Sequence, residues 1–161
     1  MEISRNYFPL NARVVRPVLE ELEGELKRRQ TVVENRIPEG KVVYADASLL
    51  KIVYCNLLSN AVKYGMEGGT ILLEAHGSGS ALTFSVRNDS AGIPQDQIPL
   101  LFRKFSRLYN PEYADKRGTG LGLHICREIL EKHGGAIWVD SQIGEWVQFS
   151  FTLPKQDEVQ T

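Results

Sequence analysis

Apolar residues recur at two different spacings along this chain, and the spacing changes at clusters of glycine, proline and small polar residues. Helical spacing, with apolar side chains three or four positions apart, runs through residues 12–29, 47–64 and 121–133. Branched residues or alternating apolar and polar residues, both typical of strands, run through 6–11, 31–37, 41–44, 70–76, 81–87, 136–141 and 145–153. This pattern predicts one α/β domain in which helices cover one face of a mostly antiparallel sheet.

Capping and turn residues indicate how these elements are joined. Asp46 is expected to cap the second predicted helix, which stops near Gly65. The run 77–80, Gly-Ser-Gly-Ser, predicts a hairpin between its flanking strands. Pro38-Glu39-Gly40 predicts a turn between the strands on either side of it.

The composition is that of a globular domain. Of 161 residues, 42% are hydrophobic, and no apolar run approaches the roughly 18 residues needed to cross a bilayer. The formal net charge of -1 gives no overall attraction to nucleic acid or anionic lipid. We therefore expect one soluble domain over residues 1–161, with a polar tail at 155–161 and no nucleic acid partner.

Cysteine and histidine spacing argues against a metal centre built from side chains alone. Cys55 and Cys126 lie among apolar residues of predicted helices, so both are expected to be buried thiols in a reducing compartment. His76, His124 and His133 have no ligand spacing with one another or with the cysteines. His133 falls at the end of the third predicted helix, where a cation would complement the helix dipole.

The run from Lys116 to Leu123 carries glycine at alternate positions, directly before the third predicted helix. Backbone without side chains at a helix start suits a polyphosphate, because main-chain N–H groups can approach closely and the helix adds partial positive charge. Lys116, Arg117 and the Thr119 hydroxyl would add donors. Taken alone, the run is equally compatible with a flexible turn that caps a helix.

Polar residues gather on one face of the second predicted helix. Asn56 and Asn60 are one turn apart, and Lys63 and Tyr64 follow on the same face. A carboxamide oxygen is a hard neutral ligand suited to Mg²⁺ held together with substrate phosphates, and lysine adds compensating positive charge. A solvated helix face is the alternative interpretation.

The strand at 81–87 leads into a turn of small residues, Asn88-Asp-Ser-Ala-Gly-Ile93, against which a planar ring could lie. An asparagine amide can accept from an exocyclic amino group and donate to a ring nitrogen, which is the pattern that binds adenine. A plain Asn-Asp-Ser turn is the alternative interpretation.

Residues 94–117 lack a clear strand or helix pattern, apart from a short helical patch near 100–105. Phe102 and Phe105 fall on one side of that patch. The side chains left exposed there are Arg103, Lys104 and Arg107. Aromatic anchors could pin one end of a mobile segment whose cations close over a terminal phosphate. Core packing with solvated charges explains the pattern equally well.

Taken in order, four segments resemble the boxes of the catalytic, ATP-binding domain of two-component histidine kinases. Asn56 to Tyr64 resembles the N box, Asn88 to Ile93 the G1 box, Leu101 to Arg107 the F box, and Arg117 to Leu123 the G2 box. The resemblance covers nearly the whole chain and extends to the superfamily that includes the ATPase domains of gyrase and MutL.

The resemblance implies the Bergerat ATP-binding fold. This is a two-layer α/β (α+β) sandwich, with a mixed, mostly antiparallel sheet of about five strands on about three helices. A flexible ATP lid would occupy residues from about 94 to about 117.

By motif position, the resemblance also implies ATP and Mg²⁺ as ligands. Asn60 would bind the metal, Asn56 would hold the adjacent catalytic site, and Lys104 would approach the γ-phosphate. The other implied nucleotide contacts are Lys63, Tyr64, Asn88, Ser90, Gly92, Ile93, Phe105, Gly118, Thr119, Gly120, Leu121, Gly122 and Leu123.

The G1 box departs from the family pattern Asp-x-Gly-x-Gly. Counting back from Ile93 puts Asn88 at the aspartate and Ser90 at the first glycine. An asparagine oxygen can still accept from the adenine amino group, but it loses charge-assisted strength worth about 1 kcal/mol. Ser90 would crowd the backbone approach, and Asp89 would substitute for Asn88 only if the turn slipped by one residue. We therefore expect binding that is weakened.

Asn56 also bears on mechanism, because related ATPases of the superfamily carry a glutamate there that activates water. An amide cannot act as that base, so the site is expected to transfer the γ-phosphoryl group to an external nucleophile. In the family that nucleophile is a histidine in a His-Glu-x-x-Arg-x-Pro context, which none of the histidines here has.

The resemblance therefore implies partners outside this chain. They are the dimerisation and phosphoacceptor domain of a parent kinase and the receiver domain of a response regulator. It further implies a cytoplasmic domain that is monomeric in isolation, within a homodimeric parent that is free or membrane-bound. Two alternatives stay open: a nucleotide-binding pseudokinase or scaffold with a degenerate G1 box, and a serine kinase or anti-sigma switch of the same superfamily.

Overall fold

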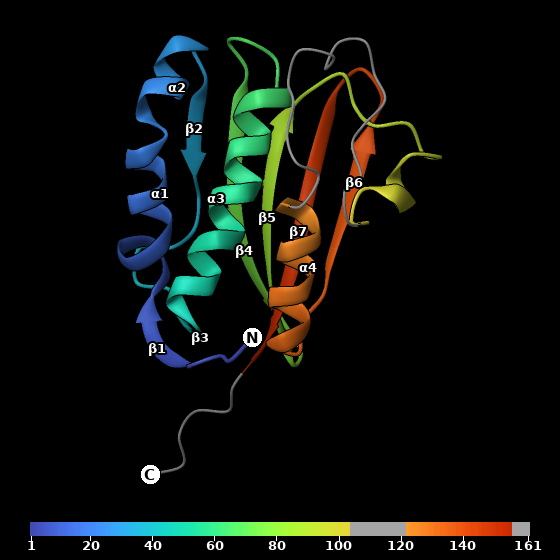
Figure 1. Cartoon of the computed structure of the whole chain (residues 1–161). Helices are drawn as coiled ribbons and strands as arrows, with labels where there is room; N and C mark the ends of the chain where they lie inside the picture. The colour runs from blue at the N-terminus through green and yellow to red at the C-terminus, as the bar shows by residue number, and fades with distance from the viewer. Residues whose placement is uncertain (104–121, 156–161) are drawn as a thin grey trace.

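The computed structural model of the protein describes residues 1–103 and 122–155 (Figure 1). Its elements in chain order are β1 (Asn6–Pro9), the π-helical turn η1 (Asn11–Val15), α1 (Arg16–Glu21), α2 (Glu23–Arg28), β2 (Val32–Asn35), β3 (Val42–Ala45), α3 (Ala47–Tyr64), β4 (Thr70–Ser78), β5 (Ala81–Asp89), the 3-10 turn η2 (Ile98–Leu100), α4 (Gly122–Lys132), β6 (Ile137–Gln142) and β7 (Trp146–Pro154).

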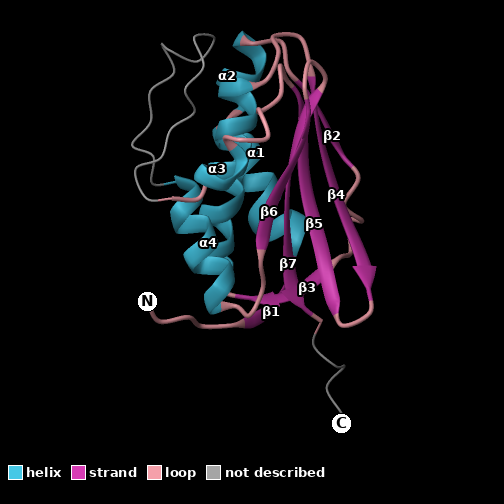
Figure 2. Ribbon diagram, turned by 90° about the vertical axis from the view of Figure 1, so that its right-hand side faces the viewer, coloured by secondary structure: helices cyan, strands magenta, loops and turns pink. Residues whose placement is uncertain are grey.

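The main sheet has the strand order β2-β4-β5-β7-β6. β2 runs parallel to β4, and the other neighbouring pairs are antiparallel. The helices α1 to α4 lie on one face of this sheet, as Figure 2 shows edge-on. The expected two-layer fold with a mixed, mostly antiparallel sheet is confirmed, and so is the hairpin that joins β4 and β5.

The strands flanking Pro38-Glu39-Gly40 do not form a hairpin. The turn itself is present, because the Lys41 N–H donates to the Pro38 carbonyl at 3.0 Å. However, the Asn11 side chain donates to the Ile37 carbonyl at 2.9 Å, and the Ile37 N–H donates to Asn35 Oδ1 at 3.0 Å. Side-chain amides thus satisfy the backbone after β2, and β3 pairs with β1 in a separate two-stranded sheet.

The helix expected over residues 12–29 is divided into three pieces, η1, α1 and α2. The interruption between α1 and α2 falls at Leu22, whose φ and ψ of -93° and 1° leave the helical region. Backbone bonds still cross it, since the Leu22 N–H donates to Val18 and the Leu26 N–H to Leu22. The apolar stripe therefore continues on one face although the helix does not, and the low helix propensity of Gly24 favours the interruption.

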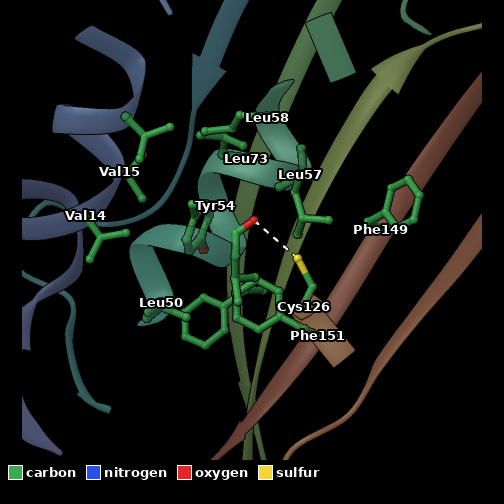
Figure 3. Packing of buried hydrophobic residues seen from close by; sticks show 14 of the residues in the cluster. Val14, Val15, Leu50, Tyr54, Leu57, Leu58, Leu73, Cys126, Phe149 and Phe151 are labelled. Atoms are coloured by element: carbon green, nitrogen blue, oxygen red, sulfur yellow. Dashed lines mark hydrogen bonds between the residues drawn. The ribbon is translucent and has the colours of Figure 1, made fainter. Parts of the chain in front are cut away.

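The core fills the space between α3 and the sheet (Figure 3). The Phe151 ring lies edge-on to Tyr54 at 5.5 Å and stacked on Phe84 at 5.2 Å. Cys126 of α4 points its sulfur at the Val53 carbonyl, 3.9 Å away, and burial raises the pKa of this thiol to about 12. Cys126 is buried as expected, whereas Cys55 is only half-buried, so that part of the expectation was wrong.

Among the described helices, none is long and apolar enough to cross a membrane.

Helices α3 and α4 run antiparallel. A hydrogen bond joins the residue before α3 to the residue after α4. Asp46 caps α3 as expected, with its side chain accepting from the Leu49 N–H at 3.1 Å. The Asp46 N–H donates to Nε2 of His133, just beyond α4, at 3.0 Å. His133 Nδ1 lies 2.8 Å from the Ile129 carbonyl and donates to it. The ring is therefore buried with both nitrogens in hydrogen bonds, whereas its position had suggested a cation that complements the helix dipole.

Candidate functional site

The second half of α3 presents the polar face expected from the sequence. Val53, Leu57 and Ala61 are buried against the sheet, which follows from their spacing on the helix. Asn56 and Asn60 lie one turn apart on a different face and are half-buried. At the end of the same helix Tyr64 is half-buried, and Lys63 is exposed.

Asn56 lies directly against the start of α4. Its Nδ2 donates to the Ile52 carbonyl of the previous turn at 2.9 Å. Its Oδ1 is so close to Gly122 that a Cβ built on that glycine would lie 2.6 Å away. The last glycine of the glycine-rich run thus leaves room for this side chain of α3, and a larger residue there would displace it. The contact brings Asn56 to the N-terminal end of α4. Backbone N–H groups have no helical partner there, and the helix dipole is positive.

Asn88 ends the buried part of β5, on the side of the sheet that α3 covers. Its Nδ2 donates to the Asp89 carbonyl at 3.2 Å, and Gly65 at the end of α3 lies next to this amide. That carbonyl is held in turn, because it accepts from the Met66 N–H at 2.8 Å. Among the described residues, none donates to the Asn88 Oδ1, so this oxygen is the acceptor that the side chain can offer to a ligand.

Ser90, which was expected to crowd the backbone approach, is part of the turn after β5. Its side chain is buried and accepts from the Gly92 N–H at 3.1 Å, so the hydroxyl lies within the turn itself. Gly92 has φ of +87°, and a Cβ on it would lie 2.8 Å from the Ile143 Cα. Both the backbone angle and the close approach of the neighbouring hairpin require glycine here.

Ser141 of β6 holds the turn after β5, and sequence reasoning missed it. Its Oγ accepts from the Ile93 N–H at 2.7 Å and donates to the Trp146 carbonyl at 3.2 Å. The Gly144 N–H also donates to the Ala91 carbonyl, at 2.7 Å. The β6–β7 hairpin therefore holds the turn after β5 in place. No local signal marks Ser141, because its role depends on a contact between segments far apart in the sequence.

The Asp89 side chain lies on the opposite face of β5 from the Asn88 side chain. Its Oδ2 accepts from the Thr70 N–H at 2.9 Å. The β5 register puts Asn88 opposite Ile71 and Val147 on the two neighbouring strands. A slip of one residue would break this pairing and move every β5 side chain to the other face, so Asp89 is unsuited to replace Asn88.

Phe102 is buried, which both interpretations of the sequence pattern allow. Its ring is buried and lies edge-on to Phe149 of β7, with centroids 6.2 Å apart. Its carbonyl lies 3.3 Å from His124 Nδ1 on the first turn of α4, and the other ring nitrogen of His124 lies 3.1 Å from Glu128. The two segments that flank residues 104–121 are therefore joined.

Several expected site residues lie outside the described residues. They are Lys104, Phe105, Gly118, Thr119, Gly120 and Leu121, together with most of the expected lid at 94–117. Of the remaining expected contacts, Ile93 is buried behind the turn after β5, and Leu123 is half-buried and packs on the core.

The described residues suit a magnesium-bound nucleotide in their chemistry. Asn60 offers a neutral hard oxygen of the kind that Mg²⁺ accepts alongside phosphate and water. Lys63 supplies positive charge on the same helix, and α4 begins beside Asn56 with backbone donors. Asn88 offers one acceptor near the end of α3.

The chain matches a family of ATP-binding proteins over the segments that form this site. Residues 45–157 match the model of histidine kinase-, DNA gyrase B- and HSP90-like ATPases. The adaptive-response sensory kinase SasA of Synechococcus elongatus is 35% identical over 143 residues, which are 88% of this chain and 36% of that protein. SasA of a Nostoc species is 41% identical over 140 residues, which are 83% of this chain and 34% of that protein. The chain thus spans about a third of the length of these relatives.

Solved structures show the same fold. The nucleotide-free catalytic domain of histidine kinase ThkA is 32% identical, with a TM-score of 0.78 and coverage of 96% of this chain and 97% of that one. Full-length ShkA in complex with AMPPNP is 26% identical, with a TM-score of 0.80 and coverage of 96% and 32%. ThkA in complex with the response regulator protein TrrA is 28% identical, with a TM-score of 0.76 and coverage of 98% and 44%.

The family match takes in the α3 face, the turn after β5 and the start of α4, which are the segments that meet at the site. It extends over more than half of the chain, and the ThkA catalytic domain is covered almost completely. This chain belongs to the family of histidine kinase-, DNA gyrase B- and HSP90-like ATPases, and its fold is that of histidine kinase catalytic domains.

Proposed function

We propose that this chain binds Mg·ATP between the polar face of α3 and the start of α4, and transfers the γ-phosphoryl group to a histidine of a separate domain. The observation that carries the proposal is the contact between Asn56 and Gly122, because it joins the amide-bearing helix to the helix start best suited to phosphate. The AMPPNP complex of ShkA supports a nucleotide at a site of this fold.

The base would lie beside the turn after β5. Asn88 would accept a hydrogen bond from the adenine amino group through Oδ1, since its Nδ2 is engaged by the Asp89 carbonyl. Gly92 and the buried Ile93 would shape the rest of this subsite, held by Ser141. The neutral amide supports a contact weaker than that of a carboxylate.

The phosphates would lie toward α4. Asn60 would hold Mg²⁺, which supplies charge neutralisation for the phosphate oxygens when bound. Lys63 and Tyr64 would contact the nucleotide from the end of α3, and Gly122 and Leu123 would provide backbone at the start of α4. Lys104, Phe105 and residues 118–121 stay proposals from the motif resemblance alone.

Asn56 favours transfer over hydrolysis. Its carboxamide cannot take a proton from water, and its Nδ2 is already bound to the Ile52 carbonyl. Its part is to hold its position against α4 while an imidazole nitrogen forms the new P–N bond and ADP leaves. Positioning of the reactants is the main contribution that such a site makes.

The acceptor histidine would belong to a dimerisation and phosphoacceptor domain, from which an aspartate of a response regulator would receive the group. The ThkA complex with TrrA supports a response regulator as partner. We propose a cytoplasmic domain that is monomeric alone and part of a homodimeric kinase.

A transfer assay tests this function. The chain is incubated with γ-labelled ATP, Mg²⁺ and a histidine-bearing phosphoacceptor domain, and the labelled product is treated with acid. We expect acid-labile label on the acceptor, lost in Asn60→Ala and retained in Asn6→Ala, which makes the same change on the exposed strand β1. Acid-stable label would favour a serine kinase. Binding without transfer to several such domains would favour a pseudokinase.

A further inference from the structure

The loop that leaves α3 is held from two sides, by Arg29, which lies outside the four motifs, and by Asp89, which lies in the G1 segment. This loop, residues 65–69, directly follows Lys63 and Tyr64 and connects α3 to β4. One side is held by Arg29 at the end of α2, and the other by Asp89 at the end of β5. Arg29 and Asp89 are about 60 residues apart in the sequence. The loop therefore joins segments of the fold that are otherwise distant.

Arg29 binds this loop at two points. Its Nη2 donates to the Gly65 carbonyl at 2.7 Å, and its own carbonyl accepts from the Gly68 N–H at 2.9 Å. The guanidinium Nε is buried and has no hydrogen-bond partner among the residues that the structure describes. Among the described ion pairs none involves Arg29, in contrast to its neighbour Arg28, which pairs with Glu25 on the surface. A half-buried cation is thus directed at a main-chain carbonyl.

Asp89 binds the same loop from the sheet. Its carbonyl accepts from the Met66 N–H at 2.8 Å, and its Oδ2 accepts from the Thr70 N–H at 2.9 Å. The fit is close, because a Cβ on Gly65 would lie 3.2 Å from the Asn88 Nδ2. The position of the loop therefore sets the distance between the end of α3 and Asn88.

We infer that Arg29 is a positioning residue of the nucleotide site. The last carbonyls of a helix lack partners within it, and a cation there is favoured by the helix dipole. Arg29 supplies that cation to α3 and thereby fixes Lys63, Tyr64 and the Asn88 amide relative to one another. It touches neither substrate nor metal and acts through Gly65. This inference rests on the proposed function.

A purely structural role and a positioning role give different results. If Arg29 only stabilises the fold, its removal lowers the melting temperature and leaves the nucleotide affinity of the folded protein unchanged. If Arg29 positions the site, affinity falls as well. The loss appears in KM rather than in kcat, because Asn56 lies against Gly122, more than two turns of α3 before Gly65, and stays in place.

The experiment uses the whole chain and three variants: Arg29→Met, Arg29→Lys and the matched control Arg28→Met. ATP affinity is measured by calorimetry with Mg²⁺, melting temperature without nucleotide, and KM and kcat in the transfer assay. We expect Arg29→Met to raise the dissociation constant about fivefold to tenfold with kcat unchanged. Arg29→Lys should recover most of the affinity, and Arg28→Met should match the wild type.

The outcomes separate this inference from the proposed function. Unchanged affinity in a folded Arg29→Met chain overturns the inference and leaves the function standing. A wild-type chain that binds no nucleotide overturns both. If Arg29→Met fails to fold, Asp89→Ala loosens the same loop from the sheet, and unchanged affinity there would overturn the inference equally.

Discussion

The side-chain oxygen of Asn56 lies beside the bare Cα of Gly122, where a Cβ would be 2.6 Å away. The glycine-rich run therefore serves two needs. In the proposed function it offers backbone to an anion, and its last glycine lets α4 approach the amide-bearing face of α3. The relative position of the two helices at the site depends on this contact, while the His133 bond to Asp46 fixes their far ends.

Replacing Gly122 with alanine should impair function more than stability. The displaced atom is the end of a side chain, so Asn56 can rotate at a cost of about 1 kcal/mol. Moving Asn56 should weaken Mg·ATP affinity and transfer by roughly tenfold or more. Gly24→Ala is the control, since a Cβ there meets nothing within 4 Å. Equal transfer rates in both variants would contradict the role given to Asn56.

Asn88 should select adenine over guanine although it lacks a charge. Turning the amide over would bring Oδ1 against the Asp89 carbonyl, 3.2 Å from the present Nδ2, and two acceptors repel each other there. ATP and 2,6-diaminopurine triphosphate should thus bind at least about tenfold more tightly than ITP or GTP. Competition against a labelled ATP analogue measures this, and similar affinities for ATP and ITP would show that the amide is not held.

Ser141→Ala should destabilise the turn after β5. The substitution leaves the buried Ile93 N–H without its acceptor, which should lower the free energy of unfolding by about 1–3 kcal/mol. Nucleotide affinity should fall too, because Ile93 and Gly92 shape the proposed base subsite. Denaturant unfolding checks the first effect and calorimetry the second. Ser80→Ala, in the exposed β4–β5 hairpin, should change neither, and an equal loss in both variants would count against a specific role.

Asp46 should make stability depend on pH in acid. Burial alone would raise the pKa of this carboxyl, but hydrogen bonds from the Ser4 and Leu49 N–H groups bring it below the ordinary value of 3.8. A folded-state pKa below the unfolded value gives stabilisation that is present above the unfolded value and lost as pH falls through the folded one.

The matching variant is Asp46→Ala. Near neutral pH it should lower the free energy of unfolding by about 1 kcal/mol through loss of the cap. Urea titrations at a series of pH values should show this difference shrinking below the unfolded pKa of 3.8. A difference that stays constant into strong acid would mean that the carboxylate charge contributes nothing.

Local signals predicted α3 completely, because the apolar spacing lies within the element and its caps, Asp46 and Gly65, lie directly beside it. The order of elements and the two-layer fold followed from periodicity in the same way. The division of α1 from α2 at Leu22 was not predictable, since the apolar stripe passes through it unchanged. Nor was the separation of β2 from β3, which depends on Asn11 and on the pairing of β3 with β1.

The candidate site was predictable to the extent that its proposed residues fall in motifs. Asn56, Asn60, Asn88 and Gly122 were found from the sequence, but the contact between Asn56 and Gly122 was not. Ser141 and Arg29 carry no motif signal, because each acts on a main-chain group of a segment far away in the sequence. Ser90 differs from them, because its hydroxyl accepts from the Gly92 N–H of its own turn, which is a local contact.

The central claim is that a magnesium-bound adenine nucleotide occupies the space between α3 and the start of α4. Calorimetric titration of a non-hydrolysable ATP analogue into the chain, with and without Mg²⁺, tests it most directly. We predict saturable binding at one site that is strengthened by Mg²⁺ and weakened in Asn60→Ala. The absence of heat with either ATP or ADP, at millimolar protein and with magnesium present, would contradict the account.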